Sequence, residues 1–270
     1  MTARHPLAFL GCVALLLLAA PSADAGQVEA YGRGSNEVWL LRPAGRIQSV
    51  VVLGHGWKTS PPSGLSWVEQ LRPWIDHLLA RGNAVIFPRY QLGTGDWADV
   101  RRVKAYRLGL ALAFRHLAAK RVPVVAAGYS FGGSLAFYYA ANANNWGLPP
   151  PAAVDAVFPA GMISGASLHR LRRSTRVLIQ VGDRDVEAGT AGGTAWGHWL
   201  GNHRRGRRFE TVRSTAALTA THDAPKEANA TAQGVFWKPL DGLVEASRGP
   251  GPVRGVLLWL FARVLLALGV

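Results

Sequence analysis

The chain has 270 residues, of which 49% are hydrophobic, and its 30 basic and 16 acidic side chains give a formal net charge of +14. This length and apolar content suffice for one large α/β domain with a well-buried core, and no internal repeat or low-complexity tract is present. The single cysteine is Cys12, and if the first 25 residues are removed as predicted below, the remaining chain is expected to have no disulfide, cysteine nucleophile or cysteine metal site.

Residues 1–25 predict a secretory signal peptide. Arg4 and His5 precede an apolar stretch at 7–20, and the small-residue ending Ala23-Asp-Ala25 fits an A-x-A cleavage site. An uncleaved N-terminal anchor is the less favoured alternative. We therefore expect an exported protein, periplasmic or secreted, with its folded domain at 26–250.

Residues 251–270 predict an apolar C-terminal helix. The run Val256–Leu268 is interrupted by Arg263 and is shorter than the roughly 20 residues that a membrane-spanning helix needs. A helix packed on the domain and an interfacial membrane contact both fit this pattern, and the sequence does not choose between them.

The positive charge is concentrated in the clusters His169–Arg176 and His203–Arg208. A solvated, arginine-rich face explains them best, and an anionic membrane or envelope surface is the alternative partner. Nucleic acid is not expected, because no basic-aromatic recognition motif accompanies them.

Apolar periodicity predicts alternating strands and helices along the mature chain. In chain order these are one or two edge strands within 27–43, a strand at 47–53, a helix at 67–80, a strand at 83–88, a helix at 99–119, a strand at 122–127, a helix at 133–141, and strands at 154–161, 176–182 and 208–212. This alternation predicts an α/β fold with a mostly parallel sheet, helices on both faces and a site at the carboxyl ends of the strands.

The strands at 154–161 and 176–182 are separated by only about a dozen residues, which leaves little room for a lid domain. We therefore expect little or no lid and an open cleft, which Trp57, Trp67 and Tyr129 are expected to line.

The pentapeptide Gly128-Tyr-Ser-Phe-Gly132 fits the G-x-S-x-G nucleophile elbow. A valine-rich strand precedes it and a helix follows it, which is the context that this motif requires. Ser130 is the predicted nucleophile, and the start of the following helix favours an oxyanion.

Two further groups are needed to activate a serine, and the chain offers them in the order Ser, Asp, His. Asp185 and Asp183 both follow the strand at 176–182, and Asp185 is favoured as the acid because it lies further out on the loop. Asp183 remains the alternative and would otherwise serve as a turn or cap residue. His222 is the predicted base, since it alone of the eight histidines has the required position in this order.

The turn Gly54-His-Gly-Trp57 ends a strand expected to lie beside the nucleophile strand. Backbone N–H groups of Trp57 and Phe131 are the expected oxyanion-hole donors. His55, Gly56 and Tyr129 are assigned to substrate binding, with His55 expected to shape the loop rather than transfer a proton.

Together these motifs resemble the serine-type α/β-hydrolase family over roughly residues 30–245. The resemblance extends in outline to the small, lid-poor branch with esterase-like and dienelactone hydrolase-like proteins, although the latter use cysteine as nucleophile. It implies an exported serine hydrolase that cleaves carboxylic esters, small or lipid-like, through an acyl-enzyme and with no cofactor or metal. An acyltransferase using the same residues, or a non-catalytic envelope-associated binding module, is the alternative.

Overall fold

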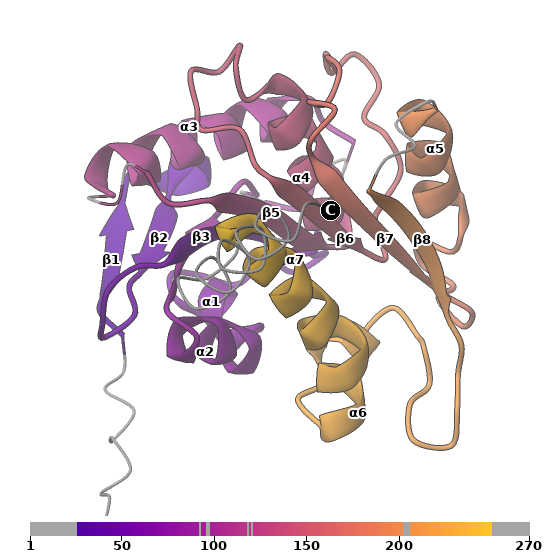
Figure 1. Ribbon diagram of the computed structural model, residues 1–270. Coiled ribbons are helices and arrows are strands. Elements are labelled where there is room, and N and C mark those ends of the chain that lie inside the picture. Colours follow the sequence, from indigo (N-terminus) through magenta and orange to yellow (C-terminus); the bar gives the residue numbers. More distant parts are fainter. Residues whose placement is uncertain are drawn as a thin grey trace, which may run out of the picture.

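A single sheet of eight strands organises the molecule. The computed structural model describes residues 26–91, 93–95, 98–117, 119, 121–201 and 206–249. In this part of the chain the strand order is β1-β2-β4-β3-β5-β6-β7-β8 (Figure 1). The strands are β1 (Val28–Tyr31), β2 (Val38–Leu41), β3 (Ser49–Gly54), β4 (Asn83–Pro88), β5 (Val124–Tyr129), β6 (Ala153–Val157), β7 (Arg176–Gly182) and β8 (Arg207–Val212). Only β2 pairs antiparallel, with β1 and with β4, so the predicted, mostly parallel sheet is confirmed.

Helices cover both faces of this sheet (Figure 1). One face carries α3 (Arg101–His116), α4 (Phe131–Asn142) and α5 (Ala191–Leu200); the other carries α1 (Ser66–Glu69), α2 (Arg72–Ala80), α6 (Ala230–Ala232), the π-helical turn η3 (Gln233–Trp237) and α7 (Lys238–Arg248). Short 3-10 turns lie at η1 (Gly34–Asn36) and η2 (Ala224–Lys226). Alternate residues of β3 enter the two cores, with Val50 and Val52 on one side and Val51 and Leu53 on the other. Burial on both faces explains why these strands are continuously apolar.

The predicted helix at 67–80 is wrong as a single helix, because it is divided into α1 and α2. Pro73 lies in the first turn of α2, where its missing N–H and fixed φ are tolerated. The same ring would clash with the carbonyl four residues earlier in a continuous helix. A helix therefore ends and a new one begins at this point.

The helices α5, α6 and α7 were not predicted from the sequence. The segment of α5 contains three glycines, which lower intrinsic helix propensity. Packing explains one of them, since a Cβ on Gly193 would lie 2.4 Å from the Cγ1 atom of Val181 in β7. The close approach of helix and strand thus requires a residue that weakens the sequence pattern.

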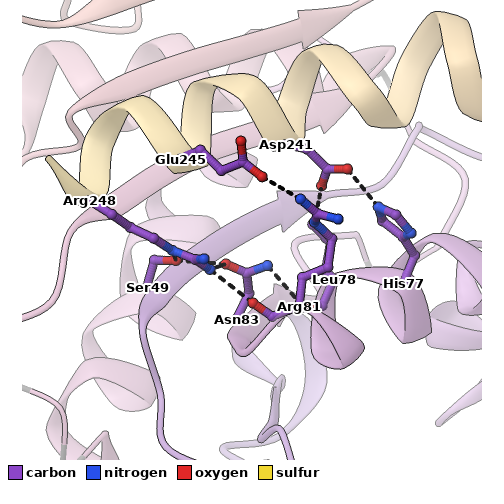
Figure 2. Close-up of polar contacts among 8 residues, drawn as sticks. All are labelled: Ser49, His77, Leu78, Arg81, Asn83, Asp241, Glu245 and Arg248. Carbon is purple, nitrogen blue, oxygen red and sulfur yellow. Dashed lines mark hydrogen bonds and ion pairs between the residues drawn. The ribbon is translucent and has the colours of Figure 1, made fainter. Parts of the chain in front are cut away.

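Two polar groups hold α7 against α2 (Figure 2). The carboxylate of Asp241, only 8% exposed, accepts a hydrogen bond from Nε2 of His77 at 2.8 Å and lies 3.3 Å from Nε of Arg81. Arg81 also pairs with Glu245 one turn further along α7. The helix is therefore fixed both by its apolar face and by a line of charged contacts.

The last turn of α7 is tied to the amino ends of two central strands (Figure 2). The guanidinium of Arg248 donates to Ser49 Oγ at 3.0 Å, to Asn83 Oδ1 at 2.8 Å and to the carbonyl of Arg81 at 3.0 Å. Asn83 in turn donates to the carbonyl of Leu78 at 2.8 Å. These bonds stabilise the edge of the sheet opposite the strand ends where Ser130 lies.

The segments at both ends of the chain lie outside the described residues. The predicted signal peptide at 1–25 and the predicted apolar helix at 251–270 therefore stay predictions, as does the division of the chain at these points. Among the helices that the structure does describe, none has the length and apolarity needed to cross a membrane.

Asp155, the third residue of β6, has a fully buried carboxyl group. It shares a face of β6 with Ala153 and Val157, both of which lie in the core beneath α7. Neither of its carboxyl oxygens has a hydrogen-bond partner among the described residues. Burial, followed by the nearby charge of Glu210, raises the pKa of Asp155 from 3.8 to about 8.

This raised pKa predicts that the protein loses stability as the pH rises. Between pH 3.8 and about 8 the folded protein keeps the proton of Asp155 while the unfolded chain has released it. The free energy of unfolding should therefore decrease across that window by up to about 1.4 kcal/mol per pH unit from this group. Asp155→Asn should remove the decrease in urea titrations, whereas Asp76→Asn, at an exposed carboxylate, should not. An unchanged pH slope in Asp155→Asn would contradict the assignment.

Candidate active site

Ser130 lies in a strained turn between β5 and α4. Its φ of 56° and ψ of −125° are unusual for a residue with a side chain, and such a conformation costs about 1–3 kcal/mol. The surrounding backbone enforces it: the N–H of Ser130 donates to the carbonyl of Val157 at 2.9 Å, and its carbonyl accepts from the N–H groups of Gly133 at 2.9 Å and Ala160 at 3.1 Å. The hydroxyl is thereby held at the amino end of α4.

Glycines allow α4 to approach the sheet at backbone contact distance. A Cβ on Gly132 would lie 2.2 Å from the carbonyl carbon of Gly54, and a Cβ on Gly128 would lie 2.3 Å from that of Gly132. A Cβ on Gly56 would lie 2.7 Å from the ring of Tyr129. No other residue fits these positions without displacing the backbone or the ring, so the glycines of both motifs have a steric explanation.

The side chain of His222 joins the other two predicted residues. Its Nε2 lies 2.9 Å from Ser130 Oγ, and its Nδ1 lies 2.9 Å from Asp185 Oδ2. These residues are 92 and 37 positions away from His222 in the chain, and all three side chains are buried. The structure therefore brings Ser130, His222 and Asp185 into one hydrogen-bonded chain.

Asp185 is held as an anion that orients the imidazole. Its second carboxylate oxygen, Oδ1, accepts the N–H groups of Glu187 at 2.9 Å and Ala188 at 3.0 Å. Burial raises the pKa of Asp185, but the hydrogen bonds from His222 and from the two N–H groups outweigh it, and the net pKa is lowered. An ionised Asp185 keeps the proton of His222 on Nδ1, which leaves Nε2 free to accept the hydroxyl proton of Ser130.

Asp183 has a different structural role from Asp185. Its carboxylate accepts the N–H of Ser214 at 2.9 Å and the hydroxyl of Ser214 at 2.6 Å. The Ser214 oxygen accepts the N–H of Ala220 at 3.0 Å, two residues before His222. Asp183 thus stabilises the loop that carries the histidine, whereas Asp185 contacts the histidine itself.

The two expected oxyanion-hole donors, Trp57 and Phe131, both follow strands that end at the same edge of the sheet as Ser130. Gly54 and Gly128 are paired in register on the neighbouring parallel strands β3 and β5, so the segments that follow them emerge together. Phe131 is the first residue of α4, and Trp57 follows the turn after β3. A Cβ on Gly56 would lie 3.2 Å from the Cβ of Ser130, so the turn that precedes Trp57 passes beside the serine.

Tyr129 packs directly against the imidazole. Its ring centroid lies 5.0 Å from that of His222, and its hydroxyl donates to Asp223 Oδ1 at 3.2 Å. Only 3% of Tyr129 is exposed, so it forms a wall of the site rather than a projecting contact. Asp223 was not singled out from the sequence, although its position next to His222 could have suggested it.

His55 is enclosed by aromatic rings. Its ring lies 4.2 Å from that of Tyr90 and 4.0 Å from that of Trp67, and its Nδ1 donates to the carbonyl of Gly56 at 2.7 Å. Burial lowers the pKa of His55 to about 3, so the ring is neutral. This supports the expected role in shaping the turn, and a substrate contact would have to come from its backbone. Trp67 is wholly buried in the core, so its predicted place in the cleft is wrong.

Four charged residues that the sequence did not single out surround the imidazole and Tyr129. Glu187 Oε2 lies 3.7 Å from His222 Nε2, and Lys226 pairs with Asp223 and lies 5.2 Å above the ring of Tyr129. Lys58 directly follows Trp57, and its ammonium group lies within interaction range of Lys226, Asp223 and Glu187. No group of three metal-ligating side chains occurs within the described part of the chain.

No protein-family model matches this sequence, and no curated protein matches it. Solved structures do resemble the fold. An inhibitor-bound esterase B from Lactobacillus rhamnosis aligns with a TM-score of 0.60 and 15% identity, covering 83% of this chain and 88% of that one. A bacterial heroin esterase gives a TM-score of 0.63 and 13% identity, covering 84% and 86%. An alpha-beta serine hydrolase homologue from Coxiella burnetii gives 0.53 and 15%, covering 82% and 96%.

The sheet order, the helices on both faces and these similarities establish that the chain has the α/β-hydrolase fold. The prediction of little or no lid agrees with the structure, since residues 158–175 between β6 and β7 contain no helix or strand. At these low identities the similarity shows the fold, and the chemistry depends on the site itself.

The glycine contacts predict opposite effects for two glycine substitutions within helices. Gly132→Ala should lower the free energy of unfolding by about 3 kcal/mol or more, because the new methyl group meets backbone atoms that cannot rotate away. Gly242→Ala in α7, where the added Cβ meets nothing within 4 Å, should instead raise it by about 0.5–1 kcal/mol. Urea unfolding monitored by circular dichroism measures both. A Gly132→Ala protein as stable as the wild type would refute the close backbone contact.

Proposed function

We propose that this protein is a serine hydrolase that cleaves carboxylic esters through an acyl-enzyme. The observation that carries this proposal is the position of His222, with one ring nitrogen 2.9 Å from Ser130 Oγ and the other 2.9 Å from Asp185. A hydroxyl, a base and an anion in this arrangement can generate a nucleophile at neutral pH. The similarity in fold to esterases supports the same class of reaction.

In the first half of the reaction, Ser130 Oγ attacks the ester carbonyl carbon while Nε2 of His222 accepts the hydroxyl proton. The carbonyl oxygen becomes an oxyanion, which the N–H groups of Trp57 and Phe131 and the amino end of α4 stabilise. The intermediate then breaks the bond to the alcohol oxygen. His222 returns its proton to that oxygen, and the alcohol leaves an acyl group on Ser130.

In the second half, water takes the place of the alcohol. Nε2 of His222 accepts a proton from the water as its oxygen attacks the acyl carbon, and the same N–H groups hold the second oxyanion. Collapse breaks the bond to Ser130 Oγ, which recovers its proton from His222. Throughout, the ionised Asp185 stabilises the imidazolium form that occurs transiently on His222.

Two alternative functions, acyl transfer and non-catalytic binding, account for fewer of the observed features. A second alcohol in place of water would give acyl transfer, and no contact in the described site favours it. A binding module has no need for the strained backbone of Ser130 or for a histidine joined to both serine and aspartate. Export by the predicted signal peptide at 1–25 is part of the proposal and would place the activity outside the cytoplasm.

A fluorophosphonate probe tests the nucleophile directly. It should label the wild-type protein at Ser130, and Ser130→Ala should remove both the labelling and the hydrolysis of p-nitrophenyl esters. Adding a competing alcohol and identifying the products separates hydrolysis from acyl transfer. Folded protein that is neither labelled nor active on esters of any chain length would refute the proposal.

The two aspartates of the loop after β7 provide a matched pair of variants. Asp185→Asn should lower kcat by about 10⁴-fold, because an amide can no longer hold the imidazole in the required tautomer. Asp183→Asn should mainly lower the melting temperature, since its carboxylate binds Ser214 rather than His222. Initial rates together with thermal unfolding distinguish them. A larger loss of kcat in Asp183→Asn than in Asp185→Asn would reverse the assignment.

A further inference from the structure

The surroundings of the imidazole hold two lysines whose charge the proposed reaction does not use. Lys58 follows Trp57, the expected oxyanion donor, and Lys226 lies four residues after His222. Both side chains are partly buried, and they approach each other closely enough to interact. Two cations at such short range repel each other unless an anion lies between them or beside them.

Lys58 is held in place by a buried glutamine. The side chain of Gln91 is wholly buried, and its Oε1 accepts the backbone N–H of Lys58 at 2.9 Å while its Nε2 donates to the Lys58 carbonyl. Nε2 also donates to the carbonyl of Gly93 at 3.0 Å. This clamp fixes the backbone from which the Lys58 side chain extends, and its ammonium group lies within interaction range of Lys226, Asp223 and Glu187.

Lys226 forms a close ion pair, but among the described residues Lys58 forms none. The ammonium of Lys226 pairs with Asp223 and lies over the ring of Tyr129. In the described ranges Lys58 forms neither an ion pair nor a side-chain hydrogen bond with an acidic group. Burial first, and then the neighbouring Lys226, lower the pKa of Lys58, and the more distant carboxylates of Asp223 and Glu187 offset this only in part.

Glu187 is the acidic group positioned to exchange with a ligand. Its side chain is 67% exposed, and its carboxylate lies 3.7 Å from Nε2 of His222. This nitrogen is the atom of the imidazole that faces the bound substrate in the proposed reaction. An ester bound for attack by Ser130 would displace this carboxylate. The negative charge near Lys58 would then be reduced unless the substrate supplied its own.

We propose that Lys58, with Lys226 beside it, binds a carboxylate carried by the ester substrate, so that the site prefers anionic esters to uncharged ones. This inference rests on the proposed ester hydrolysis. The carboxylate would be on the acyl part, as in a dicarboxylic acid half-ester, or on the alcohol part, as in the ester of a hydroxy acid. A charge-assisted hydrogen bond from a partly buried ammonium gives the preference its strength.

Two matched substrate pairs test the preference and locate the charge. Mono-p-nitrophenyl adipate against its methyl ester places the carboxylate on the acyl side, and 3-acetoxybenzoate against methyl 3-acetoxybenzoate places it on the alcohol side. In at least one pair the anionic member should have a kcat/KM about tenfold higher or more. Raising the ionic strength should reduce this ratio, because salt screens partly exposed charges.

Lysine variants connect the preference to the proposed residues. Lys58→Met should reduce the anionic-to-neutral ratio of kcat/KM about tenfold, mostly through KM. Glu187→Gln should increase the ratio by removing the competing carboxylate. Arg107→Met, at an exposed position on α3, removes one positive charge elsewhere and should leave the ratio at the wild-type value.

The outcomes separate this inference from the function beneath it. Turnover of neutral esters with Ser130 labelled, but with no anionic preference in either pair, overturns the carboxylate site and leaves the hydrolase proposal standing. Equal losses on both members of a pair in Lys58→Met also overturn it, since they indicate a role in the turn alone. If Ser130 is unlabelled and no ester is cleaved, both proposals fail together.

Discussion

The contact on which the site depends is the approach of the start of α4 to the ends of β3 and β5 without intervening side chains. Gly54, Gly128 and Gly132 meet there at distances that leave no space for a Cβ. This contact forces Ser130 into its strained turn and brings the segments after β3 and β5 together at one edge of the sheet. The nucleophile and both expected oxyanion donors follow from one steric constraint.

The rest of the site lies on loops, and hydrogen bonds of Asp183 and Asp185 hold these loops in place. Asp183 binds Ser214 and so stabilises the loop that carries His222, whereas Asp185 binds the imidazole itself. Two carboxylates of one short segment therefore have different roles, one structural and one in orienting the base. At the opposite edge of the sheet, Arg248 and Asp241 fix α7 over the second core. The strained turn of Ser130 and the charged groups around it thus lie at the carboxyl ends of the strands, and the hydrogen bonds of Arg248 lie at the amino ends.

Charge at this edge is arranged unevenly. Asp223 is shared between Tyr129 and Lys226, while Lys58 is held by its backbone and lacks a comparable partner. Partly buried ionisable groups with perturbed pKa values cluster at functional sites, where a ligand can supply the missing ion-pair partner. The hydrogen bonds that position Lys58 would therefore also determine which class of ester the site prefers.

The sequence by itself determined the parallel α/β fold, because valine-rich runs buried on both faces and the glycine pattern around Ser130 depend only on local residue types. It also ordered Ser130, Asp185 and His222 along the chain, but could only favour Asp185 over Asp183. That choice, the break between α1 and α2, the glycine-containing α5 and the burial of Trp67 were decided by tertiary structure. The same holds for the grouping of Lys58, Glu187, Asp223 and Lys226. The break at Pro73 has a local cause that the apolar spacing of 67–80 hides. The others depend on contacts between segments distant in the chain, and residue spacing carries no information about which loop folds over which.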